Sequence, residues 1–105
     1  MTAHTSASGR AHVVTAKSGI EGFTRALAFE FAKQNIAVNC ISPGKIGGER
    51  AESAGEVALT PDAVPPVGYM GEPENIAVIA HALCLPAARY TTGQTINVNG
   101  GMIMM

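Results

Sequence analysis

Residues 12–44, HVVTAKSGIEGFTRALAFEFAKQNIAVNCISPG, decide the fold, because a long helix pattern leads directly into a short strand pattern. Apolar residues three or four positions apart predict a helix that starts near Ser8 or Arg10 and ends near Gln34. The apolar face of that helix would consist of Val13, Ala16, Ile20, Phe23, Leu27 and Phe31. A second apolar strip consists of Ala26, Phe29 and Ala32. Two apolar strips predict that the helix is covered on two sides, by a sheet and by another layer.

The end of the helix and the following strand are also predicted from this stretch. Asn35 tolerates the left-handed conformation that closes a helix, and Lys33 places a cation in the last turn. Residues 36–42 are apolar on both faces, as in a parallel strand covered on both sides. Pro43-Gly44 then predicts a turn, because Pro43 cannot donate to a ladder.

A second helix and strand follow in the C-terminal half. Glu72-Pro73 predicts a helix start and Pro86 its end, with Ile76, Ile79, Ala80 and Leu83 on the apolar face. Residues 95–99 predict a second strand, ended by Gly100-Gly101. Residues 1–11 are predicted to be loop. The Gly- and Pro-rich segment 45–71 is predicted to be irregular, with weak helical potential over 49–59.

These elements predict an α/β fold of about two parallel strands with helices on both faces. Two parallel strands joined through a helix form a right-handed crossover unit, so each helix should cover one face of the sheet. A sheet of two strands would leave one edge of the first strand unpaired. We therefore expect residues 1–105 to form a single partial domain.

The composition excludes several classes of partner. The 105 residues carry a net charge of -1, which gives no reason to expect nucleic acid or an acidic membrane surface. No apolar run is long enough to span a bilayer and no signal peptide is visible, so a cytoplasmic location is expected. Only 14% of the residues are charged while 47% are apolar, which predicts a surface covered by other protein and a homo-oligomer or self-association.

The two cysteines indicate neither a disulfide nor a metal site. Cys40 falls in the strand pattern and Cys84 in the second helix pattern. Both are predicted to be buried reduced thiols, since free cysteine packs as a small hydrophobe. The two lack metal-ligand spacing, so no metal is expected.

Three blocks of the chain resemble the C-terminal part of a short-chain dehydrogenase/reductase, with oxoacyl-carrier-protein reductases nearest. The first block consists of Lys17, residues 22–28, Glu30, Ile36, and residues 38–39 and 42–44. The second block is residues 71–77 and the third is residues 92–101. The resemblance covers nearly the whole chain but only about the last two fifths of a typical member. It implies a fragment of a Rossmann-like doubly wound parallel sheet, NAD or NADP as cofactor, and a small carbonyl or alcohol substrate. Residues 45–71 would then be the variable segment that caps the substrate.

The resemblance makes Lys17 the candidate catalytic and cofactor-binding residue. In the family's Tyr-x-x-x-Lys motif the Lys lowers the pKa of the Tyr and holds the nicotinamide ribose, while the Tyr donates a proton. The Tyr position is Val13 here, which has no proton to give. His12 is a poor substitute, because one residue along a helix is a rotation of about 100°.

The same resemblance implies cofactor contacts after the first strand. Pro43 and Gly44 match the turn that meets the nicotinamide, and Ile46 matches the residue whose backbone bonds the carboxamide. A frequent family Thr is Gly48 here. A simple turn after a strand explains Pro43-Gly44 as well. The family's Ser, Asn and Gly-rich phosphate turn would precede residue 1; Ser6 and Ser8 are too close to Lys17 for the Ser position.

Other polar and glycine residues favour structural roles. Gly19 and Gly22 lie inside the predicted helix, where close packing is expected rather than phosphate binding. Asn39 is predicted to brace the backbone, since a buried amide must be bonded. Tyr69 and Tyr90 are predicted to be packing residues rather than acids, and His81 to be a satisfied or exposed histidine rather than a ligand.

Three functions remain open from the sequence. The first is that of an NAD(P)-dependent oxidoreductase, of which this chain is a piece that is inactive alone. The second is a non-catalytic oligomerisation or interaction module derived from the same family. The third, an independent enzyme that uses Lys17 alone, is the weakest.

Overall fold

A computed structural model of the chain describes His4 and residues 9–48 and 64–104. The elements are α1 (Ala11–Phe31), the 3-10 turn η2 (Ala32–Gln34), β1 (Cys40–Pro43), α2 (Pro73–Cys84), the 3-10 turn η4 (Pro86–Ala88) and β2 (Thr95–Val98). Their order matches the prediction. The helical potential predicted over 49–59 and residues Ser6 and Ser8 lie outside the described residues.

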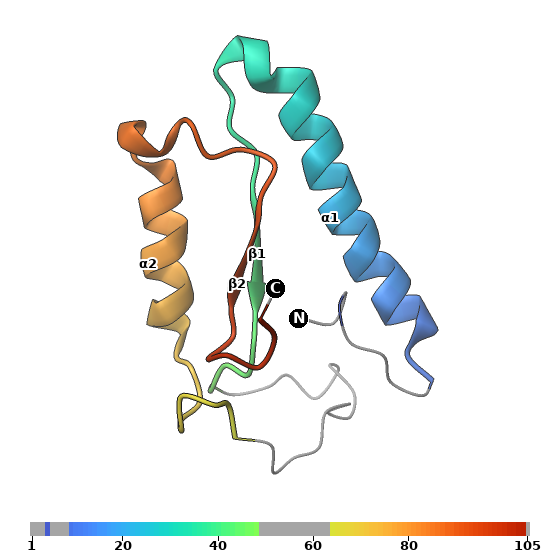
Figure 1. The fold of residues 1–105 in the computed structure, drawn as a ribbon, viewed down its shortest axis with the longest axis vertical. Coiled ribbons are helices and arrows are strands. Elements are labelled where there is room, and N and C mark those ends of the chain that lie inside the picture. The colour runs from blue at the N-terminus through green and yellow to red at the C-terminus, as the bar shows by residue number, and fades with distance from the viewer. Residues whose placement is uncertain (1–3, 5–8, 49–63, 105) are drawn as a thin grey trace.

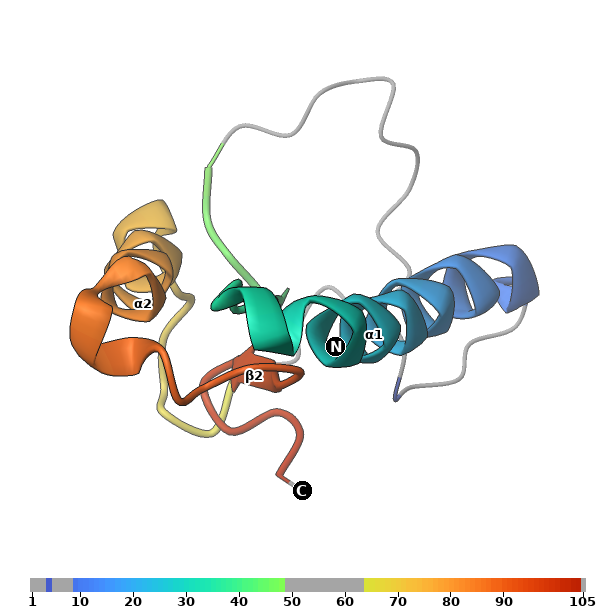
Figure 2. The same ribbon diagram turned by 90° about the horizontal axis from the view of Figure 1, so that it is seen from above.

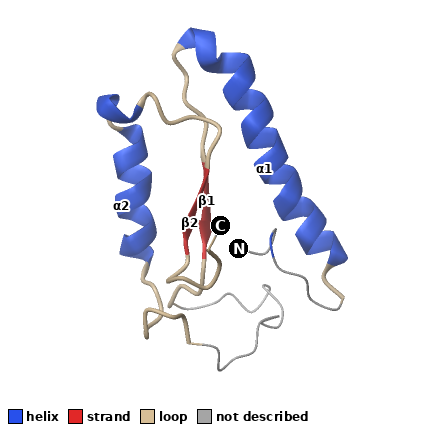
Figure 3. Cartoon of the chain, in the orientation of Figure 1, coloured by secondary structure: helices blue, strands red, loops and turns tan. Residues whose placement is uncertain are grey.

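The two strands lie between the two long helices (Figures 1 and 2). β1 and β2 are parallel and form a two-stranded sheet, with Cys40 opposite Thr95 and Pro43 opposite Val98. Helix α1 lies on one side of the sheet and α2 on the other, and both pack against β1. The α/β fold with helices on both faces is therefore confirmed (Figure 3).

Strand β1 is shorter than predicted, because its partner starts late. Residues 36–39 precede the strand, since β2 begins only at Thr95, opposite Cys40. Side chains tie these residues instead to the loop before β2. The N–H of Val38 donates to Thr92 Oγ1 at 3.0 Å, and Asn39 Nδ2 donates to the Thr91 carbonyl at 2.8 Å.

Helix α1 begins and ends as its terminal residues predict. Arg10 is the N-cap, and after η2 Asn35 takes the left-handed conformation with φ 59°. The Asn35 N–H donates to the Ala32 carbonyl at 3.1 Å, which closes the last turn. An Asn at this position satisfies an otherwise unpaired helix carbonyl at little steric cost.

Neither of the two apolar strips predicted on α1 is its buried side. The buried residues are Glu21, Thr24 and Ala28, and the predicted face is half-buried or exposed. Ile20 is 48% exposed and Phe23 63% exposed. The second predicted strip is exposed throughout. The prediction that both strips are covered was therefore wrong. Helical spacing shows that apolar residues share a side of the helix, but it does not show on which side a neighbouring element lies.

The expected close packing of the helix glycines was also wrong. A Cβ built on Gly19 would meet no atom within 4 Å, and one on Gly22 would meet only the end of the Arg25 side chain at 3.8 Å. Both positions therefore have room for a side chain in this chain.

Helix α2 agrees more closely with its prediction. It begins with Pro73 directly after the N-cap Glu72, whose backbone N–H donates to Asn75 Oδ1 at 2.8 Å. The four residues of its predicted apolar face are half-buried while the rest of α2 is exposed. Cys84 is exposed, which corrects its predicted burial, and Cys40 is half-buried; both are free thiols.

The described residues contain little core. Ala28 and Pro65 are the two apolar residues of the described chain that are buried. The helices and strands therefore have faces that no other part of the described chain covers, such as the side of α1 that carries Phe23, which is 63% exposed.

Candidate functional site

The candidate residues meet at one end of the molecule. The strands point their carboxyl ends toward the end where α1 and α2 begin (Figures 1 and 3). In open α/β sheets, ligands bind outside the carboxyl ends of the strands. Lys17, in the second turn of α1, and Pro43, at the end of β1, are therefore on the same end of the fold.

Lys17 and Val13 share one side of α1, one turn apart, as the motif requires. Val13 is half-buried and Lys17 is exposed. His12 is also exposed, and its position on the helix is rotated away from that of Val13. The helix therefore presents Lys17, and a valine where the family has its acid.

The turn after β1 is held tightly against the end of β2. The Gly44 N–H donates to the Val98 carbonyl at 2.8 Å. A Cβ on Gly44 would lie 2.5 Å from the Cα of Asn99, so only glycine fits. Asn99 itself is 7% exposed; its Oδ1 accepts the Gly101 N–H and its Nδ2 donates to the Ile103 carbonyl, each at 3.0 Å. This packing fixes the path of the chain into Lys45 and Ile46.

Ile46 forms a parallel bridge with Gly71, just before α2. The Gly47 N–H donates to the Gly71 carbonyl at 2.8 Å, and the Gly71 N–H donates to the Lys45 carbonyl at 3.0 Å. In such a bridge the central residue directs its own N–H and C=O to the opposite side. The bridge therefore directs the N–H and C=O of Ile46 away from Gly71.

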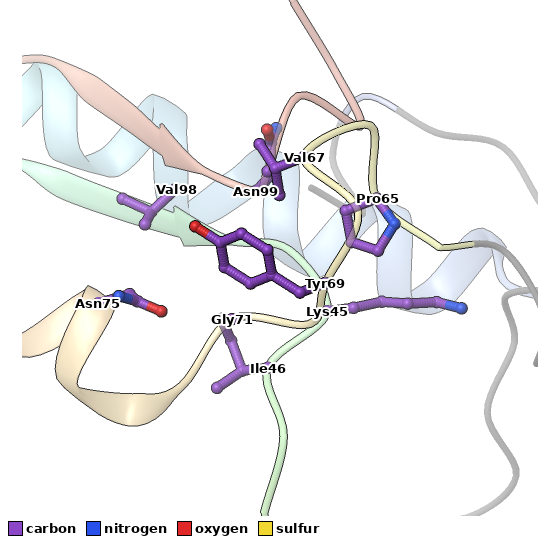
Figure 4. Close-up of a pocket in the computed structure, with 10 residues that line it drawn as sticks. Lys45, Ile46, Pro65, Val67, Tyr69, Gly71, Asn75, Val98 and Asn99 are labelled. Carbon is purple, nitrogen blue, oxygen red and sulfur yellow. The ribbon is translucent and has the colours of Figure 1, made fainter.

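A small cavity lies next to this bridge, and Ile46 and Gly71 are among the residues that line it (Figure 4). It has a volume of about 170 Å³ and lies between the end of β2, the first turn of α2 and residues 65–71. The Tyr69 ring lies over it, between Asn99 and Gly71, and is 64% exposed. The Val67 N–H donates to the Gly100 carbonyl at 3.2 Å, which holds residues 65–71 against β2.

Asn39 is a bracing residue, as predicted. Its Nδ2 donates to the Thr91 carbonyl, and its Oδ1 accepts the Gln94 N–H at 3.1 Å. These bonds lie at the opposite end of the strands from Pro43. Tyr90 is fully exposed and Tyr69 largely exposed, which corrects their predicted packing, whereas His81 is exposed, one of its two predicted states.

Sequence reasoning did not single out the pair of Glu21 and His4. Glu21 is 8% exposed on the side of α1 that faces the sheet, and its Oε1 lies 2.9 Å from His4 Nε2. The sequence did contain a signal for this burial. Glu21, Thr24 and Ala28 are three or four residues apart and therefore share one side of the helix. Within the described ranges, no three metal-ligating side chains come together.

Two adjacent parallel strands with a helix on each side are the arrangement found in doubly wound α/β folds. A sequence model of the family described as Enoyl-(Acyl carrier protein) reductase matches residues 1–103. The chain therefore belongs to the short-chain dehydrogenase/reductase family.

Its curated relatives are oxidoreductases of the same family. The chain is 43% identical over 99 residues to an acetoacetyl-CoA reductase of Shinella zoogloeoides. The aligned region includes 92% of this chain and 41% of that protein. It is 38% identical over 98 residues to a 3-oxoacyl-[acyl-carrier-protein] reductase of Vibrio cholerae, covering 40% of that protein with 92% of its own length. The chain thus spans about two fifths of the length of the curated relatives it matches.

Solved structures agree on the fold. An acetoin dehydrogenase from Salmonella typhimurium superposes with a TM-score of 0.78 at 30% identity, over 95% of this chain and 38% of that protein. A blue fluorescent protein from a metagenomic library, solved with NADPH, superposes with a TM-score of 0.73 at 32% identity, over 86% of this chain and 36% of that protein. In the parts of the chain that are described, no helix is long and apolar enough to cross a membrane.

Proposed function

We propose that this chain supplies the nicotinamide end of the cofactor site of an NAD(P)-dependent oxidoreductase, which reduces a carbonyl or oxidises an alcohol in the cytoplasm. The observation that carries the proposal is the bridge between Ile46 and Gly71. It directs the Ile46 N–H and C=O outward at the carboxyl end of β1, where a carboxamide can accept one bond and donate the other.

The neighbouring residues fit the same cofactor. Gly44 carries no side chain at the turn, and its packing on Asn99 fixes the approach to Ile46. Lys17 adds an exposed ammonium group at this end of the fold, suited to the hydroxyls of a ribose. NAD(P)H, when bound, supplies the hydride, and these residues hold and orient its nicotinamide end.

Val13 limits what this chain does by itself. A carbonyl that receives a hydride also needs a proton, and valine cannot donate one. The proposed chemistry therefore requires an acid from elsewhere in the completed protein, and the 105-residue chain alone is inactive.

The alternative is a non-catalytic oligomerisation or interaction module. It is favoured by the exposed apolar residues of α1, with Phe23 63% and Phe29 90% exposed. Such a module would keep its surfaces without needing Lys17 or the outward backbone groups of Ile46.

Binding of NADPH distinguishes the two functions. We suggest joining residues 1–105 to the N-terminal part of the Vibrio cholerae relative, and titrating the hybrid with NADPH by fluorescence. Lys17→Met should weaken binding about tenfold or more, since a bond to a charged group contributes about 1.5–3 kcal/mol. Lys33→Met is the matched control, because Lys33 lies in η2 at the far end of the helix. A folded hybrid without affinity for NADPH, or equal effects of the two substitutions, would favour the interaction module.

A further inference from the structure

The cavity next to the bridge between Ile46 and Gly71 plays no part in the proposed cofactor contacts. The bridge directs the N–H and C=O of Ile46 away from Gly71, whereas Ile46 also lines the cavity (Figure 4). A Cβ built on Gly71 would lie 2.8 Å from Ile46 Cδ1, so the Ile46 side chain packs directly on Gly71. The backbone and the side chain of Ile46 therefore face two different places.

The chain itself fixes the walls of this cavity. The Gly68 N–H donates to the Pro65 carbonyl at 2.8 Å, which closes a turn beside it. Gly100 has a positive φ of 60°, and a Cβ there would lie 2.8 Å from Pro65 Cβ and 2.9 Å from Val67 Cγ2. Because these contacts are made within the chain, the cavity is preformed, and a ligand would spend little free energy on ordering it.

The volume and the lining of the cavity suit a small uncharged ring. Its volume of about 170 Å³ exceeds the roughly 150 Å³ that is enough for benzene. Among the lining residues that the structure describes, Lys45 is the one with a charge, and its side chain extends away from the cavity in Figure 4. A charged ligand would therefore lose its hydration without meeting an opposite charge there. The apolar side chains of the lining are those of Ile46, Pro65, Val67 and Val98.

Tyr69 provides an aromatic surface at the cavity. Its ring lies over the cavity in Figure 4, and the residue is 64% exposed, so a ligand can reach the cavity from solvent. Aromatic rings attract one another when they are offset-stacked or edge-to-face, with centroids about 4.5–7 Å apart. The Tyr69 hydroxyl makes no hydrogen bond to another residue of the described chain, so it can bond to a hydroxyl of the ligand.

We propose that this cavity binds a neutral aromatic ring, such as that of a phenol, at a site separate from the cofactor contacts. The ring would enter beside Tyr69 and pack against the side chains of Ile46 and Val98. The N–H and C=O of Ile46 would remain available to the nicotinamide end of the cofactor, so the two ligands bind at the same time.

NMR spectroscopy with labelled isoleucine methyl groups tests the proposal, on the hybrid protein that completes the fold. Phenol is the probe. The Ile46 δ1 methyl resonance should shift with a dissociation constant of about 1 mM, which is realistic for a ligand of so few atoms. The Ile20 methyl resonance is the internal control, because Ile20 lies on α1 and does not line the cavity. Benzoate, which has the same ring and a negative charge, should bind about tenfold more weakly or worse.

Tyr69→Ala should weaken phenol binding about five- to tenfold, because the ligand loses its aromatic neighbour. Tyr90→Ala is the matched control. Tyr90 is fully exposed and does not line the cavity, so its substitution should leave phenol binding unchanged. Since Tyr69 is itself largely exposed, both variants should fold.

A titration with NADPH in the presence of saturating phenol completes the test, and the affinity for NADPH should be unchanged. An Ile46 resonance that does not shift, equal binding of benzoate, equal effects of the two substitutions, or competition between phenol and NADPH would overturn the proposal. A hybrid that binds phenol and no NADPH would support the ring site while contradicting the proposed function.

Discussion

Gly44 and Asn99 are in such close contact that the turn after β1 has no space for a side chain. A Cβ on residue 44 would lie 2.5 Å from the Asn99 Cα and 2.8 Å from its Cβ. Both contacts are to atoms that cannot rotate away. The pair therefore locks the two carboxyl ends of the strands together, and with them the position of Ile46.

Gly44→Ala should consequently destabilise the chain by about 3 kcal/mol, the upper part of the usual range for overpacking. The backbone of β2 would have to move away, which would weaken the bond from the Gly44 N–H to the Val98 carbonyl. Urea unfolding followed by circular dichroism measures the change. An effect below about 0.5 kcal/mol would show that the turn and β2 are not held together as described.

Gly19→Ala should have the opposite effect and is the natural control. Gly19 lies in the interior of α1, and a Cβ there would meet no atom within 4 Å. Replacing a helix glycine by alanine stabilises by about 0.5–1 kcal/mol. The same urea experiment applies, and a loss of stability would mean that another surface packs closely on this part of α1.

Local signals in the sequence predicted the elements well. Asn35, Pro73 and Pro86 set helix boundaries through backbone conformation and hydrogen bonding, which depend on neighbouring residues only. The Pro43-Gly44 turn was predicted on the same grounds. These features need no knowledge of distant parts of the chain.

Long-range packing could not be predicted in the same way. The apolar spacing of α1 predicted that the strip with Ile20 and Phe23 is covered, whereas the buried side of the helix carries Glu21 and Thr24. Strand β1 starts at Cys40 because β2 begins at Thr95, opposite Cys40. The residues of β1 alone carry no information about where β2 begins. The bridge from Ile46 to Gly71 joins residues that are far apart along the chain, so the orientation of the Ile46 backbone required the structure.

The isolated 105-residue chain should self-associate or aggregate. Only 14% of its residues are charged, β1 has a free edge, and Phe23 and Phe29 are largely exposed. Sedimentation at tens of micromolar should show species larger than a monomer. A folded monomer at that concentration would contradict this expectation.

Restoring the missing acid should raise activity in a completed protein. With residues 1–105 joined to the N-terminal portion of a relative, Val13→Tyr would place a phenol one helical turn from Lys17. General acid catalysis contributes about 10²–10⁴-fold, so carbonyl reduction with NADPH should increase within that range. Tyr at residue 12, made by His12→Tyr, serves as the control, because that position is rotated by about 100°. Equal rates for the two variants would mean that α1 does not present position 13 to a substrate.

The 105-residue chain by itself should neither bind NAD(P)H tightly nor reduce a carbonyl. Lys17 and the backbone of Ile46 would hold only one end of the cofactor, and in the described chain neither β1 nor β2 leads through a G-x-G-x-x-G turn into a helix. Calorimetry should therefore show no saturable binding at cofactor concentrations below about 1 mM. A dissociation constant of about 1 mM corresponds to a binding free energy of only about 4 kcal/mol. Proton donation and cofactor binding are separate requirements, so Val13→Tyr in the isolated chain should not restore turnover. Micromolar binding together with turnover that is lost in Lys17→Met would instead establish this chain as an independent enzyme.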